Sequence, residues 1–428
     1  MSRRVLVVDG VRTPFVKAGA DLSSVAAWQL GSAAAREVTV RAGLSPEQID
    51  EVIFGCVAHP SDSANIARVV ALRSGVPEST PALTVSRNCA SGLEAVTLAA
   101  EKIAAGTADI VLCGGLESMS QIPLHYPQSF SRKLSGVMRA RSLGEKLVAL
   151  SALRFRDFKP VIALEQGLTD PTCGEIMGLT GERLAREFGI SRADQDAYAL
   201  ESHRKAVAAA SRIAEEIAPL GVPPQMHDRL EADIGPRADQ SIAALQKLRP
   251  YFDRRLGTVT VGNSCQITDG AVALILASEK GAELLGSEPL GEILGHAYRG
   301  CDPRRMGLGP VHASAPALAA AGVAFEDLAR IELNEAFAAQ VLACCAAFED
   351  AEFARSVGFP DAVRVNRKLL NVNGGAIALG HPVGATGARL VLTLLHELRR
   401  SGEELGLATL CIGGGQGGAV VVKGKVAA

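Results

Sequence analysis

Two cysteines and one histidine lie in glycine-rich segments at opposite ends of the chain. Cys89 lies in the segment NCASG (88–92), His381 in GHPVG (380–384) and Cys411 in CIGGG (411–415). A thiolate is a strong nucleophile, and a neutral imidazole can take the proton that a thiol must lose. Two thiols and an imidazole can also move protons to and from carbon. These residue types therefore fit chemistry that makes or breaks carbon–carbon bonds.

Cys89 stands before a long apolar segment that predicts a helix over 89–105, with Asn88 as its N-cap. A thiol at a helix N-terminus lies near free amides and the positive end of the dipole, which favour the thiolate. The alternative for Cys89 is a small residue that serves packing. His381, taken alone, also fits a core histidine. Its flanking glycines permit close approach of a substrate, and Pro382 fixes the backbone beside the imidazole.

Cys411 follows a predicted strand over 407–410 and precedes the run GGGQGG (413–418). Such a turn could cradle a phosphate, but no Lys-Ser/Thr pair closes the motif. Exposed amides that bind an oxyanion, with Cys411 as acid and base, fit better. Asn334 follows the predicted strand 331–333, so it could hold a water or a carbonyl group at a sheet edge. The alternative is that Asn334 caps the next helix.

The composition limits the class of protein. The chain has 428 residues, of which 48% are hydrophobic, and a formal net charge of −2. That length allows two or three domains, and the charge gives no reason to expect nucleic acid as a partner. Nine cysteines form neither a disulfide framework nor paired zinc-binding motifs. With no apolar run of 18 residues and no room for a signal peptide before the strand at 5–8, we expect a reducing, cytoplasmic location and no metal.

The two halves of the chain resemble each other. AGL (42–44) corresponds to AGV (321–323), and SGLEAV (91–96) corresponds to TGARLV (386–391). The first half alternates strands and helices, with a strand at 51–55 and another at 109–113 that Gly114-Gly115 should close. Self-similarity of this kind predicts a duplicated α/β unit with largely parallel sheets. Two equivalent buried helices would then lie back to back, with their N-termini at one cleft.

The region 120–266 between the halves is richer in charge and proline. Within it, 125–160 carries eight Lys and Arg residues against Glu145 and Asp157, interleaved with apolar side chains. One interpretation is a solvated helix that covers the active-site loop domain. The other is a surface for an acidic partner or a membrane.

These residues, taken together, resemble the thiolase family over essentially the whole chain. The matching segments, in order along the chain, are VRTPF (11–15), NCASG (88–92), GGLESMS (114–120), LRPYFD (248–253), GTVTVGN (257–263), NEAF (334–337), NGGA (373–376) with the stretch to Gly387, and CIGGG (411–415).

The resemblance implies a five-layered αβαβα fold made of two duplicated domains plus a loop domain that binds coenzyme A. The N-terminal domain would span 1–119, completed by about 267–290, the loop domain 120–266 and the C-terminal domain 291–428. The family is oligomeric, so a homodimer or tetramer is expected. No permanently bound cofactor is expected, because CoA and acyl-CoA are substrates.

The resemblance also implies the roles of single residues. His381 would deprotonate Cys89, which attacks a 3-ketoacyl-CoA, and Cys411 would protonate the departing acetyl-CoA carbanion. Asn334 would hold a water that stabilises the enolate, while the N–H groups of Cys89 and Gly413 would face the acyl-enzyme oxyanion. The remaining site residues implied by the family line the acyl and pantetheine pocket: Met177, Met306, Phe337 and Cys265, the last in place of a serine.

Some features point to a subgroup. An extra stretch at Phe348–Arg364 and the segment 125–160 look like the β-subunit of β-oxidation multienzyme complexes, which commonly has His where Asn334 stands. The segment 125–160 could then bind an α-subunit or a membrane. We expect a degradative 3-ketoacyl-CoA thiolase. The alternatives are a condensing acetoacetyl-CoA thiolase and a catalytically silent lipid carrier; a decarboxylating synthase would have no need of Cys411.

Overall fold

The computed structural model describes residues 3–224, 226–286 and 288–424. The predictions that concern Met1, Ser2 and 425–428 lie outside these residues. In the described part of the chain, ten strands form one sheet in the order β12-β13-β14-β11-β1-β10-β5-β3-β4, with β2 beside β10. The strands are β1 (Leu6–Arg12), β2 (Val16–Lys17), β3 (Glu51–Gly55), β4 (Ala82–Val85), β5 (Ile110–Glu117), β10 (Thr268–Ala277), β11 (Gly291–Gly300), β12 (Arg330–Leu333), β13 (Leu405–Ile412) and β14 (Gln416–Gly424).

The sheet consists of two equivalent halves. In one half β3 is parallel to β5, which is antiparallel to β10, which is antiparallel to β1. In the other, β12 is parallel to β13, which is antiparallel to β14, which is antiparallel to β11. The halves join where β1 pairs with β11. The predicted duplication is confirmed, but the prediction of largely parallel sheets is wrong, because the short turn from β13 to β14 permits only antiparallel pairing.

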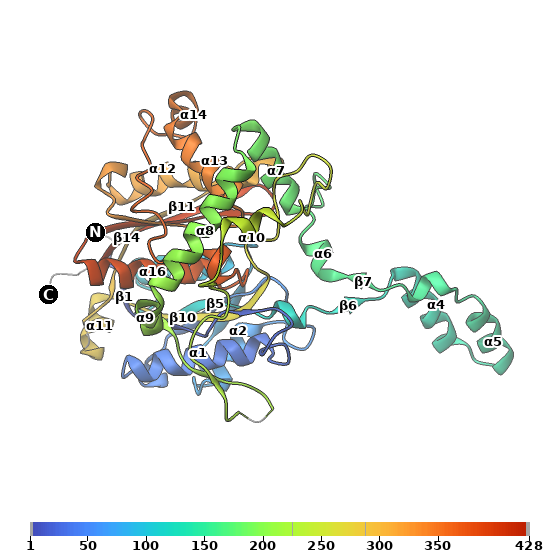
Figure 1. Ribbon diagram of the computed structural model, residues 1–428. Helices are drawn as coiled ribbons and strands as arrows, with labels where there is room; N and C mark the ends of the chain where they lie inside the picture. The colour runs from blue at the N-terminus through green and yellow to red at the C-terminus, as the bar shows by residue number, and fades with distance from the viewer. Residues whose placement is uncertain (1–2, 225, 287, 425–428) are drawn as a thin grey trace.

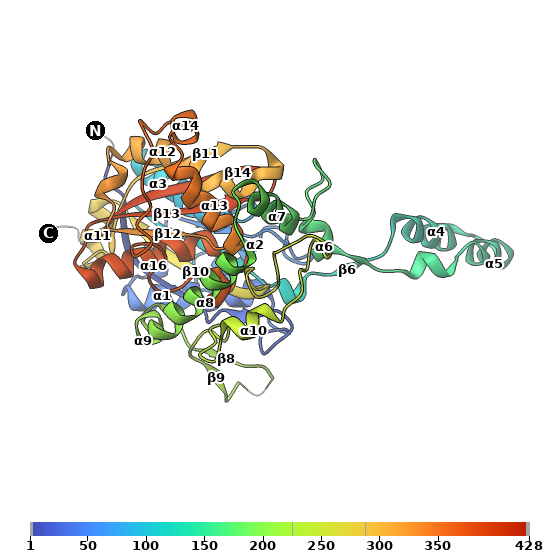
Figure 2. The same cartoon turned by 45° about the horizontal axis from the view of Figure 1, so that its top comes forward.

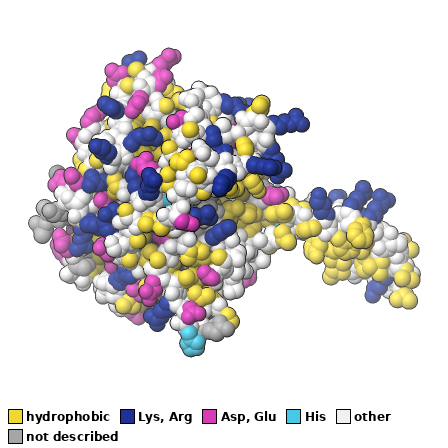
Figure 3. All heavy atoms as spheres, viewed as in Figure 1, with side chains coloured by type: hydrophobic (Ala, Val, Ile, Leu, Met, Phe, Trp, Pro, Cys, Tyr) yellow, Lys and Arg dark blue, Asp and Glu magenta, His cyan; other side chains and the backbone are white. Residues whose placement is uncertain are grey.

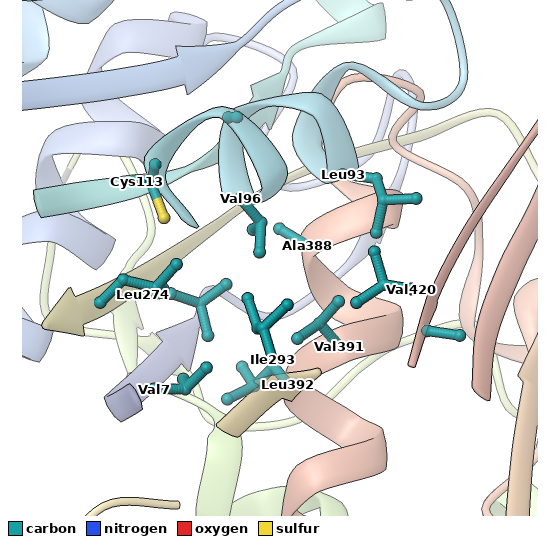
Figure 4. Packing of buried hydrophobic residues seen from close by; sticks show 14 of the residues in the cluster. Val7, Leu93, Val96, Cys113, Leu274, Ile293, Ala388, Val391, Leu392 and Val420 are labelled. Carbon is teal, nitrogen blue, oxygen red and sulfur yellow. The ribbon is translucent and has the colours of Figure 1, made fainter. Parts of the chain in front are cut away.

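Helices cover both faces of each half, as Figures 1 and 2 show. Helices α1 (Ala27–Arg41) and α2 (Ile66–Arg73) pack on the outer face of the first half. Helices α12 (Gly309–Ala321) and α13 (Ala338–Glu349) pack on the outer face of the second. Between the halves lie α3 (Ser91–Ala104) and α16 (Thr386–Ser401), whose side chains form a core with strands of both halves (Figure 4). The predicted five-layered α/β fold is confirmed.

The two central helices touch at their N-termini through glycines. A Cβ atom on Gly92 would lie 2.7 Å from the carbonyl oxygen of Gly384, and one on Gly387 would lie 2.4 Å from the amide nitrogen of Leu93. Real Cβ atoms do not come so close to backbone, so only glycine permits this approach. The back-to-back arrangement predicted from the repeat is therefore present.

Two predicted boundaries are wrong for a related reason. Strand β5 does not end at Gly114-Gly115 but continues to Glu117. A Cβ atom on Gly115 would lie 2.0 Å from the carbonyl oxygen of Gly384. This glycine therefore permits close contact with the backbone of the opposite half of the molecule. Helix α3 begins at Ser91, with Ala90 as its N-cap residue, and Asn88 does not cap it. Cys89 consequently lies in the turn that precedes α3.

The loop region between the halves divides into two parts. One part packs on the core through α7 (Met177–Glu187) and α8 (Arg192–Ala208). The other elements of this part are α6 (Ala163–Gly167), α9 (Ala210–Ile213), β8 (Leu220–Gly221), β9 (Arg229–Leu230) and α10 (Ile242–Gln246). Further helices outside the loop region are α11 (Glu279–Leu285), α14 (Ala351–Ser356) and α15 (Ala376–Leu379).

The other part, residues 124–162, projects away from the body and is called the arm below (Figures 1 and 2). The pair β6 (Leu124–His125) and β7 (Val161–Ile162) forms its base, and helices α4 (Gln128–Arg139) and α5 (Leu143–Ser151) form its tip. Neither helix contains a buried residue. Both helices are therefore solvated, as one interpretation of 125–160 expects, but they project away from the rest of the loop region and do not cover it. No helix of the described residues is long and apolar enough to cross a membrane.

Candidate active site

Cys89 is half-buried in the turn between β4 and α3. Burial raises the pKa of its thiol, while the backbone N–H groups of Gly413 and of Cys89 itself oppose that rise. The net direction is upward. The backbone N–H groups thus favour the thiolate, as expected, but burial outweighs them, so the thiol needs a base to become a nucleophile.

His381 has the tautomer and the charge state of such a base. Its Nδ1 lies 2.6 Å from the hydroxyl of Thr386, and that hydroxyl donates its single proton to the carbonyl of Pro382 at 3.0 Å. Nδ1 must therefore be the donor to Thr386, which leaves a lone pair on Nε2. Nε2 is buried and has no hydrogen-bond partner among the described residues. Burial lowers the pKa of His381 to about 4, so the imidazole is neutral at physiological pH.

The tautomer of His381 yields a test. Thr386→Val removes the acceptor of the Nδ1 proton while keeping the shape of the side chain, so Nε2 can take the proton instead. We expect kcat/KM to fall about 10-fold to 100-fold, as for other orienting partners of histidine. Thr386→Ser keeps the hydroxyl and should restore most activity. Equal loss in both variants at unchanged melting temperature would contradict the role of the hydroxyl.

Cys411 lies inside β13, one residue before its end, and is 1% exposed. Burial and the neighbouring thiols Cys89, Cys344 and Cys265 raise its pKa well above the ordinary value. The thiol is therefore protonated and can act as an acid. Cys265 is in turn affected by Cys89, which also raises the pKa of its thiol.

Asn334 follows β12, and its backbone N–H donates to Thr409 in the neighbouring strand at 3.0 Å. Neither Nδ2 nor Oδ1 of its buried side chain has a hydrogen-bond partner among the described residues. Unpartnered buried amide atoms are rare, and they fit a residue that holds a water or a substrate. The alternative of a helix cap is wrong, because α13 begins at Ala338 with Phe337 as its N-cap residue.

Comparison with known proteins decides the family. The family model of the thiolase N-terminal domain matches residues 5–280, and that of the thiolase C-terminal domain matches residues 287–424. The chain belongs to the thiolase family. It is thus an acyltransferase.

The similarity to individual thiolases extends over the whole chain. It is 41% identical to proteins named 3-ketoacyl-CoA thiolase from Yersinia pestis and Photorhabdus laumondii, over 98% of this chain and 97% of each relative. Human mitochondrial 3-ketoacyl-CoA thiolase, solved also in complex with CoA, superposes with a TM-score of 0.85 at 38% identity. The acetyl-CoA acetyltransferase of Bacillus anthracis superposes with a TM-score of 0.87 at 33% identity. Each superposition covers 99% of this chain and 98–99% of the solved chain.

The predicted pocket residues of this thiolase surround the thiols. Met177, Met306 and Phe337 pack in one cluster with Cys411. The terminal atoms of Met177 also reach the glycine turn, since a Cβ on Gly413 would lie 3.4 Å from them. Cys265 donates its backbone N–H to Ala336, and burial together with the nearby Cys89 raises its pKa to about 12.

The segment 264–267 connects the loops of this thiolase site. Ser264 pairs with Phe337 in one backbone bridge, and Ile267 pairs with His381 in another. The loop after β12 and the loop that carries His381 are therefore held on either side of Cys265.

The buried carboxylate of Glu335 anchors the segment of the chain that leads to His381 in this thiolase. Glu335 accepts hydrogen bonds from Tyr198 at 2.9 Å and Ser202 at 2.7 Å. It also accepts from Asn371 at 3.0 Å and from the N–H of Ile377 at 3.1 Å. The sequence showed it only as part of the motif NEAF (334–337), because its partners lie far away along the chain, on α8 and in the stretch 371–377.

A second carboxylate joins the two copies of the repeat. Glu117, at the end of β5, accepts from the N–H groups of Val57, Ala58 and Gly384. Burial raises its pKa to about 7. It fixes the loop 380–384, which carries His381, onto the first half of the molecule. The family motif GGLESMS contained this residue, but the sequence gave no sign of its partners.

Proposed function

We propose that this protein cleaves 3-ketoacyl-CoA with CoA, giving acetyl-CoA and an acyl-CoA shortened by two carbons, as in fatty-acid β-oxidation. The observation that carries this proposal is the neutral, unpartnered Nε2 of His381 in a site that also holds two thiols of different exposure, Cys89 and Cys411. A base, an accessible nucleophile and a buried acid are the groups that a ping-pong thiolysis requires.

In the first half-reaction, Nε2 of His381 takes the proton of Cys89, and the thiolate attacks the C3 carbonyl carbon. The tetrahedral oxyanion collapses, the C2–C3 bond breaks, and its electron pair leaves on C2 of acetyl-CoA. Cys411 donates its proton to that carbon. Cys89 now carries the shortened acyl group as a thioester, and Cys411 is a thiolate.

Two sets of donors stabilise the oxygen anions of this reaction. The enolate oxygen of acetyl-CoA lies between protonated Nε2 of His381 and a water held by Asn334. The oxyanion on the acyl carbon accepts from the N–H groups of Cys89 and Gly413. Preorganised donors of this kind are worth about 10² to 10³ in rate each. The unpartnered buried side chain of Asn334 supports its assignment.

In the second half-reaction, the Cys411 thiolate takes the proton of an incoming CoA. The CoA thiolate attacks the acyl-enzyme, and Cys89 leaves as a thiolate that recovers its proton from His381. Met177, Met306, Phe337 and Cys265 line the path of the acyl chain and the pantetheine. We propose that CoA binds in the loop domain, residues 120–266. The N-terminal core domain then comprises 1–119 together with 267–290, and the C-terminal core domain comprises 291–428.

A chain-length series tests the function. We expect kcat/KM for thiolysis of C10–C16 3-ketoacyl-CoA to exceed that for acetoacetyl-CoA, because relatives that are 41% and 38% identical to this chain are named 3-ketoacyl-CoA thiolases. The measurement is loss of the 3-ketoacyl-CoA absorbance with CoA in excess. Activity with the C4 substrate alone would favour the condensing acetoacetyl-CoA thiolase instead. Inactivity of the pure protein with every chain length would favour the lipid carrier.

We infer that the chain forms a homodimer or tetramer in the cytoplasm. Strand β4 is the last strand of the sheet, and it carries the 40% exposed Leu83. An edge strand with free backbone groups can pair with a second copy of itself. The nine cysteines, all free, support a reducing compartment.

We propose that the arm binds an anionic membrane surface. Figure 3 shows its apolar side chains gathered beside Lys and Arg. The largest exposed fractions belong to Phe155 at 99%, Met138 at 78% and Leu143 at 78%. A surface that combines apolar and basic side chains complements the acyl chains and the charge of anionic lipids.

Vesicle sedimentation tests this proposal for the arm. Wild-type protein should pellet with vesicles that contain phosphatidylglycerol, less so at high salt and less so with neutral vesicles. Replacing Met138, Leu143 and Phe155 by Glu should abolish pelleting and leave thiolysis of soluble substrates unchanged, because these residues belong to the arm, which projects away from the body of the molecule (Figure 1). Wild-type protein that ignores vesicles would overturn the proposal, and a larger complex with a β-oxidation α-subunit that the triple variant loses would assign the arm to that subunit.

A further inference from the structure

Asn88, the residue before the nucleophile, adopts a left-handed backbone conformation with φ of 45°. Asparagine tolerates this region better than other non-glycine residues. The side-chain Nδ2 of Asn88 donates to the carbonyl oxygen of Gly413 at 2.8 Å. This single bond joins the turn before α3 in the first half to the turn after β13 in the second.

The turn that receives this bond is held at its far end by Cys301, whose N–H donates to the carbonyl oxygen of Gly415 at 2.7 Å. Gly413, Gly414 and Gly415 connect β13 to β14, and the last two have φ values of 90° and 80°. Glycines have the largest backbone freedom to lose on folding. A Cβ on Gly413 would lie 3.4 Å from atoms of Met177 and 3.9 Å from Nδ2 of Asn88, so these two side chains flank the turn.

We propose that Asn88 is a positioning residue that fixes the N–H of Gly413 against the sulfur of Cys89 and the oxyanion of the acyl-enzyme. The proposal rests on the acyl transfer at Cys89 described above. The carbonyl of Gly413 belongs to the peptide that follows this residue and its N–H to the peptide that precedes it. By holding the carbonyl, Asn88 restricts rotation about the two backbone bonds of Gly413 that separate these peptides. That N–H faces the Cys89 sulfur, where it opposes the effect of burial on the thiol.

Arg87 anchors the turn before α3, in which Asn88 also lies. Its guanidinium contacts Glu94 at 2.6 Å and lies 4.2 Å from the ring centroid of Tyr298, with a longer contact of 3.4 Å to Gln416. None of these contacts reaches Gly413. Arg87 therefore fixes where the turn lies, whereas Asn88 connects it to the oxyanion donor.

The experiment uses the full-length protein with Asn88→Gly and Asn88→Asp. Glycine keeps the left-handed conformation and removes the donor. Aspartate keeps the size of the side chain but places oxygens opposite the carbonyl of Gly413. Asn366→Gly is the matched control, because Asn366 is exposed and its side chain accepts only from Lys368 in its own loop.

Two readouts separate positioning from general structure. The first is the pH dependence of iodoacetamide modification at the Cys89 peptide, measured by mass spectrometry. Both Asn88 variants should move its midpoint to higher pH, since the thiolate loses a donor. The second is steady-state thiolysis, where kcat should fall about 10-fold or more while KM changes less than about twofold. Asn366→Gly should match wild type in both.

Asn88→Gly with a wild-type alkylation profile and wild-type kcat would overturn the proposal. A loss of kcat together with a lower melting temperature and an unchanged alkylation midpoint would also overturn it, because the effect would then be structural. If wild-type protein cleaved no 3-ketoacyl-CoA, the proposed function would fail, while the alkylation profile would still report whether Asn88 places Gly413 at the Cys89 sulfur.

Discussion

Cys89→Ser is expected to lower thiolysis by about 10⁴-fold or more, since removal of a nucleophile typically eliminates nearly all chemical catalysis. A serine hydroxyl is far less acidic than a thiol, and the neutral imidazole of His381 is too weak a base to ionise it. The decisive measurement is the acyl-enzyme itself. Wild-type protein treated with acyl-CoA in the absence of free CoA should gain one acyl group on Cys89, and the variant should gain none.

The pH dependence of that acylation reports on the base. Burial lowers the pKa of His381 to about 4, so its basic form persists as the pH falls through 6 and 5. Acylation should therefore keep its rate down to about pH 5 and decline only near pH 4. His381→Asn removes the base, and the remaining rate should rise with pH because the thiol must then ionise unaided. Burst labelling of Cys89→Ser, or a wild-type pH profile in His381→Asn, would refute the assignment of nucleophile and base.

The fold was predictable because the two halves of the sequence resemble each other. Matching segments such as 91–96 and 386–391 lie at the starts of α3 and α16, which the structure places back to back. The apolar pattern located β3 at its true limits, 51–55. The direction of the strands was less accessible, because an apolar run reads the same in a parallel and an antiparallel pair. Only the length of a connection, such as 413–415, distinguishes the two.

The site was predictable as a set of residue types but not as a set of contacts. Glycine-rich motifs marked Cys89, His381 and Cys411, since close approach of backbone requires glycine. The partners that give these residues their chemistry come from elsewhere: Thr386 fixes the imidazole tautomer, Asn88 contacts the opposite half, and Glu117 anchors the loop of His381. Thr386 and Asn88 do lie inside motifs visible in the sequence, but the motifs did not indicate which residues these two side chains contact.

Helix α3 shows why local rules failed at the nucleophile. Asn88 before an apolar run predicts an N-cap, yet its side chain donates to Gly413 and the helix starts at Ser91. The hydroxyl of Ser91 accepts from the N–H of Arg87 and donates to the carbonyl of Asn88 at 2.7 Å. A tertiary hydrogen bond thus replaced the local cap, which leaves Cys89 in a turn where its sulfur can face the other half of the site.

Cys411→Ala is expected to separate the two kinds of chemistry in the site. Cleavage of the C2–C3 bond produces a carbanion that is much too basic to leave without an acid, so thiolysis of 3-ketoacyl-CoA should fall about 10²-fold to 10⁴-fold. Acylation of Cys89 by a simple acyl-CoA expels a thiolate, which is a good leaving group. The variant should therefore still form the acyl-enzyme from acyl-CoA.

Proton exchange at carbon gives the most direct measurement. Wild-type protein in D₂O should exchange the C2 protons of acetyl-CoA for deuterium. Acylation of Cys89 by one acetyl-CoA releases a CoA thiolate that takes the proton of Cys411, and the resulting Cys411 thiolate removes a C2 proton from a second acetyl-CoA, whose enolate is stabilised by His381 and Asn334. Cys411→Ala should lose this exchange, which NMR can follow. Cys344→Ala is the matched control, because Cys344 is an equally buried thiol whose sulfur contacts the carbonyl of Gly307 at 3.1 Å. Exchange that survives in Cys411→Ala would assign the proton transfer to another group. Loss of exchange with intact acylation would show that the two thiols have different roles, although burial raises the pKa of both: Cys89 carries the acyl group and Cys411 moves the proton.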